Sequence, residues 1–590
     1  GIEYQGEQVF IDCNLKEGEE YIPPLKIDVK NIPYRLFQVI DTGEEDGFSP
    51  KSCMHTLIQW RSKIVCIDLP MNVPYLLEKV SISRTEIDAV LFTHNHDDHI
   101  GELSMLMHMD KKVTVICPKI IWKSILLKAS AMMDMDMQEL SEFFNHVPIR
   151  YGQEFDYCGL HITAHPSIHP VPCAIYKIRA IVNGEWKSYG HMSDILNYTR
   201  CQKLVDDGHF SQKRFDDYKA FLQEPLTVKK IDVGTKPGGE LFSVHGHWED
   251  FVDDESEQIV LGHIREEFLP VKATVLVGQI AFAGSARNMG TSDDRYYQDK
   301  HRERAFEYLY DYLHALLEER LKKGYVSEDR VLEYAKILSD NEIQLIQANS
   351  PFLKMGGDST FVDMVISGTG SIWIEKDDTI VKITNVNAGD LIGDMGVLRE
   401  IPRTATVRAD SYLYVLRIPG LLFKQAAMTL GIFSGRLGWG QDESVLEKIW
   451  RHRVIVQGSG LFSAEIPIYI QNKIAQYADE VVLGEGDYLC QTEDDLDTLW
   501  VSDDANGFKV EIDEGALPKE FVSPPVFGEA TFYLGKKEED YRVMAKKTVS
   551  VLKLDRENFD WILDVPIFKM RLKQLVEKRN ILVERALKKG

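Results

Sequence analysis

The sequence predicts an α/β protein: layered apolar strands flanked by helices, followed by two smaller modules of short strands, each closed by a helix. Three observations support this prediction. Strand and helix patterns alternate in the first half, a long amphipathic helix follows, and the second half repeats a pattern of short strands and glycine turns. Because a domain takes roughly 150 residues, the 590-residue chain must hold several. We expect domains at 1–285, 331–440 and 441–590, with a helical connector at 286–330.

The first half contains short apolar runs that are typical of buried strands, separated by segments with helical spacing. Strands are predicted at Leu36–Ile40, Ser62–Asp68, Ala89–Thr93, Lys112–Cys117 and Ile259–Gly262. Helices are predicted at 73–81 and 119–143. This alternation favours stacked sheets covered by helices.

The second half opens with charged and apolar residues at helical spacing over 296–324, which predicts a connector helix or, through 299–321, a homodimer surface. The stretches 345–420 and 480–555 resemble each other and indicate an internal repeat. The end of the chain, Met570–Lys589, predicts a basic, solvated amphipathic helix.

The charge balance of 68 basic and 92 acidic residues gives a net charge of −24. Such a field repels nucleic acid and anionic membranes, so a phosphate-bearing substrate must be held by local positive charge or metal. The eight cysteines stand singly, which favours buried free thiols over disulfides. Without a long apolar run or a signal peptide, the sequence predicts a cytoplasmic protein that does not enter a membrane.

A cluster of metal-ligating side chains follows the strand predicted at Ala89–Thr93. His94 and His96 alternate, so both can point at one ion, and the next turn brings Asp98 and His99 to a second ion. Imidazole and carboxylate groups suit zinc, iron or manganese, and the sequence does not distinguish among these metals. A polar surface loop is the alternative interpretation.

The run His94-Asn-His96-Asp-Asp98-His99 resembles the His-x-His-x-Asp-His signature of the metallo-β-lactamase superfamily. Within that superfamily, roughly the first 285 residues look most like the phosphodiesterase branch that includes tRNase Z. The resemblance implies an αββα sandwich with two divalent metal ions, zinc above all. Two such ions about 3.5–4 Å apart supply hydroxide near neutral pH and stabilise phosphoryl oxygens.

The same resemblance implies three further ligands. It selects His169 over His165 as the third ligand of the first ion, Asp194 as the bridging carboxylate and His263 as the last ligand of the second ion. The family usually has glycine before the bridging aspartate, and Ser193 stands there in this chain.

A glycine-rich stretch at 230–248 lies between these ligands and holds His245 and His247. Either histidine could donate a proton to a leaving group, and either could equally be a structural turn residue. Together with Asp98, these two are the predicted catalytic residues.

The stretch Ala388–Ala409 has the groups that a cyclic nucleotide requires. Its phosphate needs exposed backbone N–H groups and a guanidinium, and its ribose 2′-hydroxyl needs a carboxylate. The stretch resembles the phosphate-binding cassette of cyclic-nucleotide-binding domains, whose β-roll the preceding short strands fit. The resemblance implies that Arg403 binds the phosphate and Asp394 the ribose of cyclic AMP or cyclic GMP. The contacting residues would be Gly393, Asp394, Met395, Arg403 and Thr404.

One departure concerns Asp394, because the family normally has glutamate there and aspartate reaches about 1.5 Å less. A β-roll retained without a ligand is the alternative. A second copy of the cassette begins at Gly528-Glu529-Ala530, where the expected arginine falls on Glu538 or Glu539. We expect this copy to be degenerate and to serve as structure or interface.

Together these motifs predict a metal-dependent phosphodiesterase regulated by a cyclic nucleotide, which could also be its substrate. One alternative is a tRNase Z-like RNA-processing nuclease, which the acidic chain disfavours. Another is a cyclic-nucleotide-binding signalling scaffold with a non-catalytic metal site, which the complete set of ligands disfavours.

Overall fold

The computed structural model describes residues 2–4, 7–9, 23, 25, 27–47, 49, 52–290, 294–376, 379–433, 444–462, 465–489, 497–512, 515–517, 519–535 and 541–588. Two of the cysteines, Cys13 and Cys490, and the expected second arginine position at Glu538 or Glu539 lie outside these residues.

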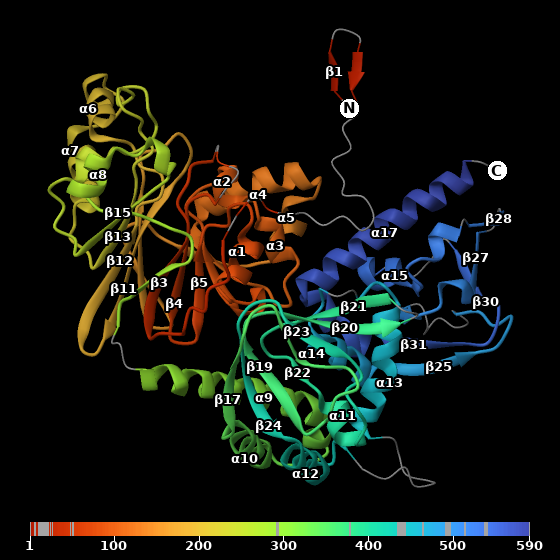
Figure 1. Ribbon diagram of the computed structural model, residues 1–590. Coiled ribbons are helices and arrows are strands. Elements are labelled where there is room, and N and C mark those ends of the chain that lie inside the picture. The colour runs from red at the N-terminus through yellow and green to blue at the C-terminus, as the bar shows by residue number, and fades with distance from the viewer. Residues whose placement is uncertain are drawn as a thin grey trace.

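Two seven-stranded sheets form the amino-terminal part (Figure 1). The first has the order β16-β3-β4-β5-β6-β7-β8, and the second has the order β15-β14-β13-β12-β11-β10-β9. The strands of the first sheet are β3 Phe37–Gly43, β4 His55–Trp60, β5 Lys63–Ile67, β6 Ile87–Leu91, β7 Thr114–Pro118, β8 Asn145–Ile149 and β16 Ser285–Asn288. Those of the second are β9 Glu154–Tyr157, β10 Leu160–Pro166, β11 Ala174–Val182, β12 Glu185–His191, β13 Val228–Asp232, β14 Gln258–Gly262 and β15 Gln279–Ile280.

Helices cover the outer faces of both sheets (Figure 1). On the first sheet they are α1 Val73–Lys79, α2 Asp97–Ile100, α3 Leu103–Met107, α4 Lys119–Met133 and α5 Met137–Ser141. On the second they are α6 Tyr198–Asp206, α7 Gln212–Leu222 and α8 Val271–Leu276. Side chains from both sheets, such as Leu57, Val65 and Tyr176, share one core between them. The predicted αββα sandwich is therefore confirmed.

Parallel pairing aligns the carboxyl ends of the central strands. Strands β5 to β8 are parallel to one another in the first sheet, as are β12 to β15 in the second. Loops that leave these ends meet at one edge of the sandwich, which is where ligand sites form in such sheets.

The connector is α9 Asp294–Lys322, followed by α10 Glu328–Ser339. Its apolar stripe, which includes Leu309, Leu313 and Leu317, is buried against the rest of the chain. That face therefore serves as a connector within the chain, and the predicted homodimer has no support from it.

A β-roll follows the connector and consists of two four-stranded sheets. Its strands are β17 Glu342–Ile346, β18 Ser350–Leu353, β19 Phe361–Ser367, β20 Gly370–Lys376, β21 Thr379–Val386, β22 Leu391–Ile392, β23 Thr406–Ala409 and β24 Leu413–Pro419. Its helices are α11 Asp394–Arg399, α12 Gly420–Leu430 and α13 Val445–Gly458. We call this module the first roll.

The second roll begins after α14 Ile468–Tyr477 and has one four-stranded and one three-stranded sheet. Its strands are β25 Asp479–Leu483, β26 Thr498–Val501, β27 Phe508–Ile512, β28 Gly515–Ala516, β29 Val526–Phe527, β30 Arg542–Ala545 and β31 Val549–Asp555. Its helices are α15 Glu529–Leu534, α16 Arg556–Phe559 and α17 Pro566–Leu587. At the other end of the chain, β1 Ile2–Tyr4 and β2 Glu7–Val9 form a hairpin. The predicted repeat of strands and helices is thus present.

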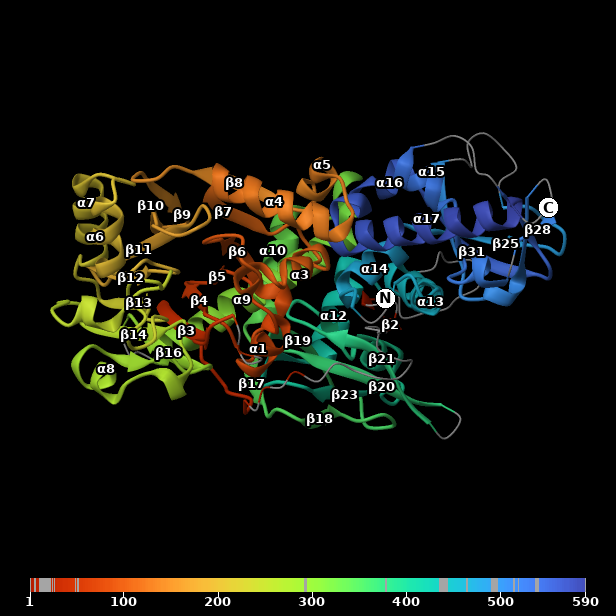
Figure 2. The ribbon, with the colours of Figure 1, turned by 90° about the horizontal axis from the view of Figure 1, so that it is seen from above.

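Two predicted helices differ from the structure. The segment 119–143 is not one helix, because Asp134 adopts a left-handed conformation with φ 49° and ends α4, while Asp136 caps α5. The terminal helix is not a solvated one. In α17, Phe568 and Leu572 are buried, and Lys573 forms an ion pair with Glu139 of the sandwich at 2.7 Å. Figure 2 shows α17 lying along the second roll and reaching the sandwich near α5.

The first roll is fixed to the sandwich through the buried carboxylate of Glu86, which lies just before β6. This carboxylate accepts hydrogen bonds from Ser367 Oγ and from the backbone N–H of Gly368, both at 3.3 Å. It also lies 3.1 Å from Arg304 Nη1 of α9. The three parts therefore meet at a buried, charged junction.

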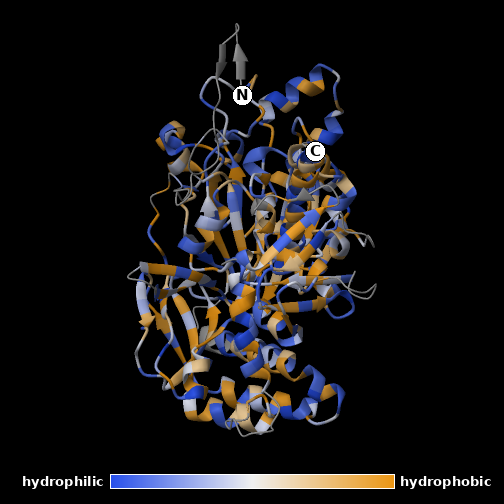
Figure 3. Cartoon of the chain, turned by 90° about the vertical axis from the view of Figure 1, so that its right-hand side faces the viewer, coloured by the Kyte–Doolittle hydropathy of each residue, from blue (hydrophilic) through white to orange (hydrophobic). Residues whose placement is uncertain are grey.

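Polar and apolar residues alternate along the surface helices (Figure 3), and no described helix has both the length and the apolar character needed to span a membrane. The described cysteines are all free thiols. Five of them are buried and Cys158 is exposed. The predicted absence of disulfides therefore holds for the described cysteines.

Candidate functional site

The predicted metal ligands converge at the edge where the parallel strands end. His94, His96, Asp98 and His99 follow β6, with His96 as the residue that precedes α2. Asp194 follows β12, and His263 follows β14. His169 lies in the loop between β10 and β11.

The predicted ligand atoms form two groups, and a third group joins Asp194 and His263 to Asp232 and His245. His94, His96, His169 and Asp194 make the first group, and within it all ligand atoms lie within 4.8 Å of one another. Asp98, His99 and His263 make the second group under the same limit.

Asp194 lies between the two groups. Its Oδ2 is 3.7 Å from His94 Nε2 and 3.6 Å from His169 Nε2. Its Oδ1 is 3.2 Å from His99 Nε2 and 3.4 Å from His263 Nε2. The carboxylate is almost completely buried, which is the position of a bridging ligand.

The buried atoms at this site fit two divalent cations. The Nε2 atoms of His94, His99 and His263, and Oδ1 of Asp194, are buried and make no hydrogen bond to any described residue. Native proteins rarely leave buried polar atoms without such a partner, so these atoms indicate a missing ligand. Imidazole nitrogens and carboxylate oxygens are the donors that first-row divalent metals take.

Asp68 supports this site, although the sequence analysis did not identify it. It follows β5 and accepts a hydrogen bond from His99 Nδ1 at 2.7 Å and from the backbone N–H and hydroxyl of Thr93 at 2.7 and 2.6 Å. Burial raises the pKa of Asp68, and His99 and Thr93 oppose that rise. The signal in the sequence that could have identified Asp68 was its position at the end of a buried strand next to β6.

Three strand-end residues at this edge have left-handed backbones: Asp68 with φ 64°, Ser193 with φ 41° and His263 with φ 60°. Such conformations are unfavourable for side chains other than glycine, and they gather at functional sites. The position before Asp194 therefore favours glycine, the usual residue in the family that the sequence resembles. Ser193 adopts the same backbone conformation at an energetic cost.

The two candidate proton donors have different surroundings. His245 Nδ1 lies 3.1 Å from Asp232 Oδ2, and its ring stacks on that of His263 with centroids 4.5 Å apart. Burial lowers the pKa of His245, but the carboxylates of Asp232 and Asp194 outweigh it and leave the pKa raised. His245 thus lies beside the metal ligands.

His247 lies apart from the metal ligands. Its Nδ1 accepts a hydrogen bond from the backbone N–H of Glu249 at 3.4 Å, at the start of a short 3₁₀ turn, Trp248–Phe251. Its Nε2 is 3.6 Å from Glu240. His165 likewise stacks on Phe221, with ring centroids 4.5 Å apart. Neither histidine belongs to the metal-ligand groups of the described residues.

Asp232, the last residue of β13, is the second supporting carboxylate that the sequence analysis missed. It accepts backbone hydrogen bonds from Ile195, Gly234 and Gly246 at 3.2, 2.7 and 3.2 Å. These bonds hold the loops after β12 and β13 together and orient His245.

A cavity of about 330 Å³ opens in the first roll and includes all the predicted nucleotide contacts. Gly393 has φ 87°, and a Cβ there would lie 2.2 Å from Arg403 Nη1. Arg403 donates to the carbonyls of Gly393 at 3.0 Å and Phe361 at 2.6 Å, while its buried Nε makes no hydrogen bond to a described residue. Met395 and Thr404 also line the cavity.

Two of the groups in this cavity come from beyond the predicted cassette. Asp394 Oδ2 accepts a hydrogen bond from Trp450 Nε1 of α13 at 3.1 Å. Arg453, also on α13, lines the same cavity. No motif marks these residues, because Trp450 stands 56 positions after Asp394 and only packing brings the two together.

The corresponding position in the second roll is closed by the chain itself. Gly528 has φ 79°, like Gly393. Glu529, which begins α15 as Asp394 begins α11, accepts hydrogen bonds from Arg579 Nη1 at 2.6 Å and from the Tyr541 hydroxyl at 2.8 Å. Arg579 is 2% exposed.

Two family profiles match the chain. Residues 39–190 match that of the anti-Pycsar protein Apyc1, and residues 344–429 match that of the cyclic nucleotide-binding domain.

Two curated relatives come from Dictyostelium discoideum. The cAMP/cGMP-dependent 3′,5′-cAMP/cGMP phosphodiesterase B is 25% identical over 221 residues, which are 36% of this chain and 20% of that protein. The cGMP-dependent 3′,5′-cGMP phosphodiesterase A is 23% identical over 239 residues, which are 40% of this chain and 26% of that protein. The matches thus span about a fifth to a quarter of the relatives' length.

Among solved structures, the metallo-β-lactamase fold protein YhfI from Bacillus subtilis is 16% identical, with a TM-score of 0.33, and covers 42% of this chain and 98% of its own. The layered sheets described above carry the assignment of the fold. The chain joins an αββα sandwich to a β-roll whose residues match the profile of the cyclic nucleotide-binding domain.

Proposed function

We propose that the chain is a metal-dependent phosphodiesterase whose activity responds to a cyclic nucleotide bound in the first roll. The observation that carries the proposal is the convergence of six predicted ligands around a seventh, the buried carboxylate of Asp194. The curated relatives support it, since both are cyclic-nucleotide phosphodiesterases by name. The proposed division is a hydrolase domain at 1–285, a connector at 286–330, a nucleotide-binding domain at 331–440 and a degenerate copy at 441–590, with α13 at the start of the last segment packed back on the first roll.

His94, His96 and His169 would hold one divalent ion, and Asp98, His99 and His263 the other, with Asp194 between them. Zinc, manganese and iron all suit these donors. When bound, such ions lower the pKa of water and stabilise the charge that develops on phosphoryl oxygens.

His245 would supply the proton for the leaving oxygen. Its Nδ1 is committed to Asp232, which leaves Nε2 as the atom that holds or releases a proton. In hydrolysis, the oxygen of water bonds to phosphorus and one proton of the water goes to solvent, the ester P–O bond breaks, and the departing alkoxide takes the proton of His245, which solvent then restores. Asp232 would act as a positioning residue that fixes the imidazole.

The preferred substrates are small phosphodiesters, with 3′,5′-cyclic nucleotides first among them. The chain carries a net charge of −24, which repels a long polyanion, whereas a single phosphate can be held by the metal site alone. In this proposal the first roll senses the same class of molecule that the sandwich cleaves.

A substrate panel on metal-loaded protein tests the proposal. Cyclic AMP, cyclic GMP, bis(4-nitrophenyl) phosphate and precursor tRNA would each be assayed with and without a second cyclic nucleotide, and metal content would be measured on the same sample. We expect close to two ions per chain and turnover of the cyclic nucleotides, which Asp194→Ala abolishes. Turnover of precursor tRNA alone would instead identify a nuclease, and a folded chain without bound metal would identify a scaffold.

A further inference from the structure

Only one oxygen of the Asp394 carboxylate accepts a hydrogen bond from the described residues. Oδ2 accepts the hydrogen bond from Trp450 Nε1 at 3.1 Å, while Oδ1 makes no hydrogen bond to any described residue. Asp394 is 7% exposed and lines the cavity, and Trp450 is 2% exposed. A largely buried carboxylate with an open oxygen is available to one further donor.

The second roll also holds its cassette carboxylate with donors from the chain. Glu529 begins its cassette helix as Asp394 does, and both of its donors, Arg579 and Tyr541, come from the chain. In the first roll, Trp450 of α13 takes the place of Arg579 of α17, because each helix follows its own roll. Both donors reach Oε2 of Glu529, so the feature that the two rolls share is one carboxylate oxygen held by a residue of the following helix.

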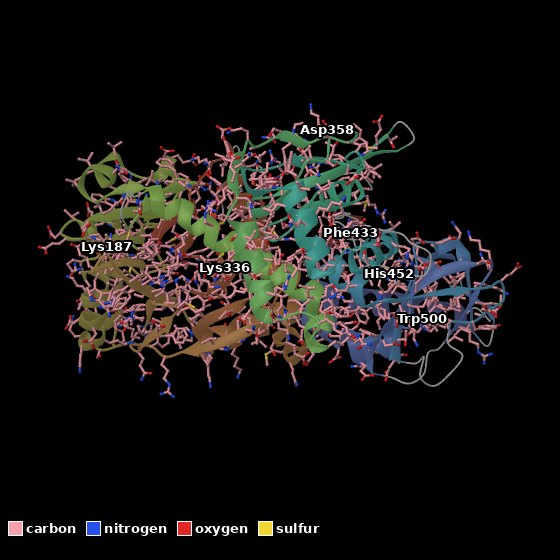
Figure 4. All side chains as sticks on the ribbon, turned by 90° about the horizontal axis from the view of Figure 1, so that it is seen from below. Lys187, Lys336, Asp358, Phe433, His452 and Trp500 are labelled. Atoms are coloured by element: carbon pink, nitrogen blue, oxygen red, sulfur yellow. The ribbon has the colours of Figure 1, made fainter. Side chains whose placement is uncertain are left out.

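Trp450 also ties the cavity to the rest of the chain. Its helix, α13, is bonded to α14 by His452 Nδ1, which donates to the carbonyl of Ala475 at 2.8 Å. Figure 4 shows His452 between Phe433 of the first roll and Trp500 of the second. The start of α14 reaches the sandwich, because the Tyr469 hydroxyl bonds to Asp110 just after α3.

We propose that Trp450 is a positioning residue for the cyclic nucleotide: its indole N–H holds the Asp394 carboxylate so that Oδ1 accepts the ribose 2′-hydroxyl. This inference rests on the proposed regulatory function. Because nucleotide and α13 then share one carboxylate, each stabilises the bound position of the other.

The test compares ligands with and without the 2′-hydroxyl. Binding of cyclic AMP and cyclic GMP, and of their 2′-deoxy forms, is measured by calorimetry on the full chain, with phosphorothioate analogues that resist hydrolysis. In the unmodified chain the 2′-hydroxyl should strengthen binding roughly 10-fold, as expected for a hydrogen bond to a charged group. In Trp450→Phe this difference should fall below about threefold, while the 2′-deoxy ligands bind as before. Trp500→Phe, in the second roll, is the matched control and should retain the full difference.

Labelling with 5-fluorotryptophan gives a second readout. The chain has nine tryptophans, and the ¹⁹F resonance missing from Trp450→Phe identifies Trp450. This resonance should shift when nucleotide binds, and that of Trp500 should not. If Trp450→Phe loses affinity equally for the 2′-hydroxyl and 2′-deoxy ligands, or keeps the full difference between them, the role of Trp450 is wrong. The proposed function would not be affected by either result. If the unmodified chain bound no cyclic nucleotide, the regulatory half of the proposed function would fail and the inference with it.

Discussion

The Nδ1 hydrogen of His99 is donated to Asp68 at 2.7 Å, inside a fully buried contact. This bond fixes the imidazole ring and leaves Nε2 to face Asp194 at 3.2 Å. A histidine held in this way is a better metal ligand, because its tautomer is chosen before the metal arrives.

Asp68→Asn should therefore weaken binding of the second ion roughly 10- to 100-fold without unfolding the chain. Titration of metal-free protein with zinc, followed by calorimetry, measures the effect. Asp156→Asn, at a carboxylate with 58% of its side chain exposed, is the control. Unchanged zinc affinity in Asp68→Asn would refute the role of this contact.

Measurements of metal content distinguish the two candidates for the third ligand of the first ion, His169 and His165. His169→Ala should retain about one ion per chain, whereas His165→Ala should retain both, because His165 stacks on Phe221 instead of facing the ligand group. Asp194→Ala should lose both ions, since this carboxylate lies within reach of both groups. Elemental analysis after gel filtration gives the three values. Loss of an ion from His165→Ala would contradict the assignment.

Arg403→Ala should reduce cyclic nucleotide affinity at least about 100-fold, because its guanidinium lines the cavity next to Gly393, at the turn expected to hold the phosphate. Its metal content should not change. Arg408→Ala, at an exposed residue of β23, is the control for charge and should bind normally. Equilibrium dialysis with labelled cyclic AMP and cyclic GMP provides the measurement. Normal binding by Arg403→Ala would show that the cassette is assigned wrongly.

Tyr469→Phe should separate nucleotide binding from its effect on hydrolysis. The variant loses the hydroxyl that bonds to Asp110 of the sandwich, but the cavity keeps its own contacts. We expect unchanged nucleotide affinity and a ratio of hydrolysis rates, with and without nucleotide, that falls toward one. Tyr477→Phe, on the same helix but bonded to Glu318 of α9, should keep the original ratio. If both variants keep it, the signal passes elsewhere.

The stability of the chain should depend on Asp390. Burial raises the pKa of this carboxyl from its ordinary 3.8 to about 7, against the backbone hydrogen bonds that it accepts. Between those two values the folded chain keeps a proton that the unfolded chain releases. The stabilisation is therefore full below pH 3.8 and is lost as the pH rises through 7.

Asp390→Asn removes this titration. Between about pH 5 and about pH 7.5, the unfolding temperature of the unmodified chain should fall on the order of 2 °C more than that of the variant. Differential scanning calorimetry across this range checks the sign, and parallel curves would contradict the assignment of the titration to Asp390.

Much of the site was visible in the linear sequence because local spacing carries chemistry. The six residues that follow one strand, 94–99, include His94, His96, Asp98 and His99, so their order alone indicates metal binding. Gly393 and Arg403 are similarly close, and a glycine turn before a short helix indicates an anion site. The strands were predictable because their apolar runs are continuous.

Other features depended on contacts between distant parts of the chain. Asp68 and Asp232 are single carboxylates at strand ends, and their roles appear only when parallel pairing brings those ends together. Trp450 and Arg579 are ordinary helical residues until each helix folds back on its own roll. The solvated end helix was predicted wrongly for the same reason, since a basic amphipathic pattern does not reveal which surface will cover it. Sequence alone determined the chemistry of short motifs, whereas tertiary packing decided which distant side chains support them, because burial and pairing join residues that spacing keeps apart.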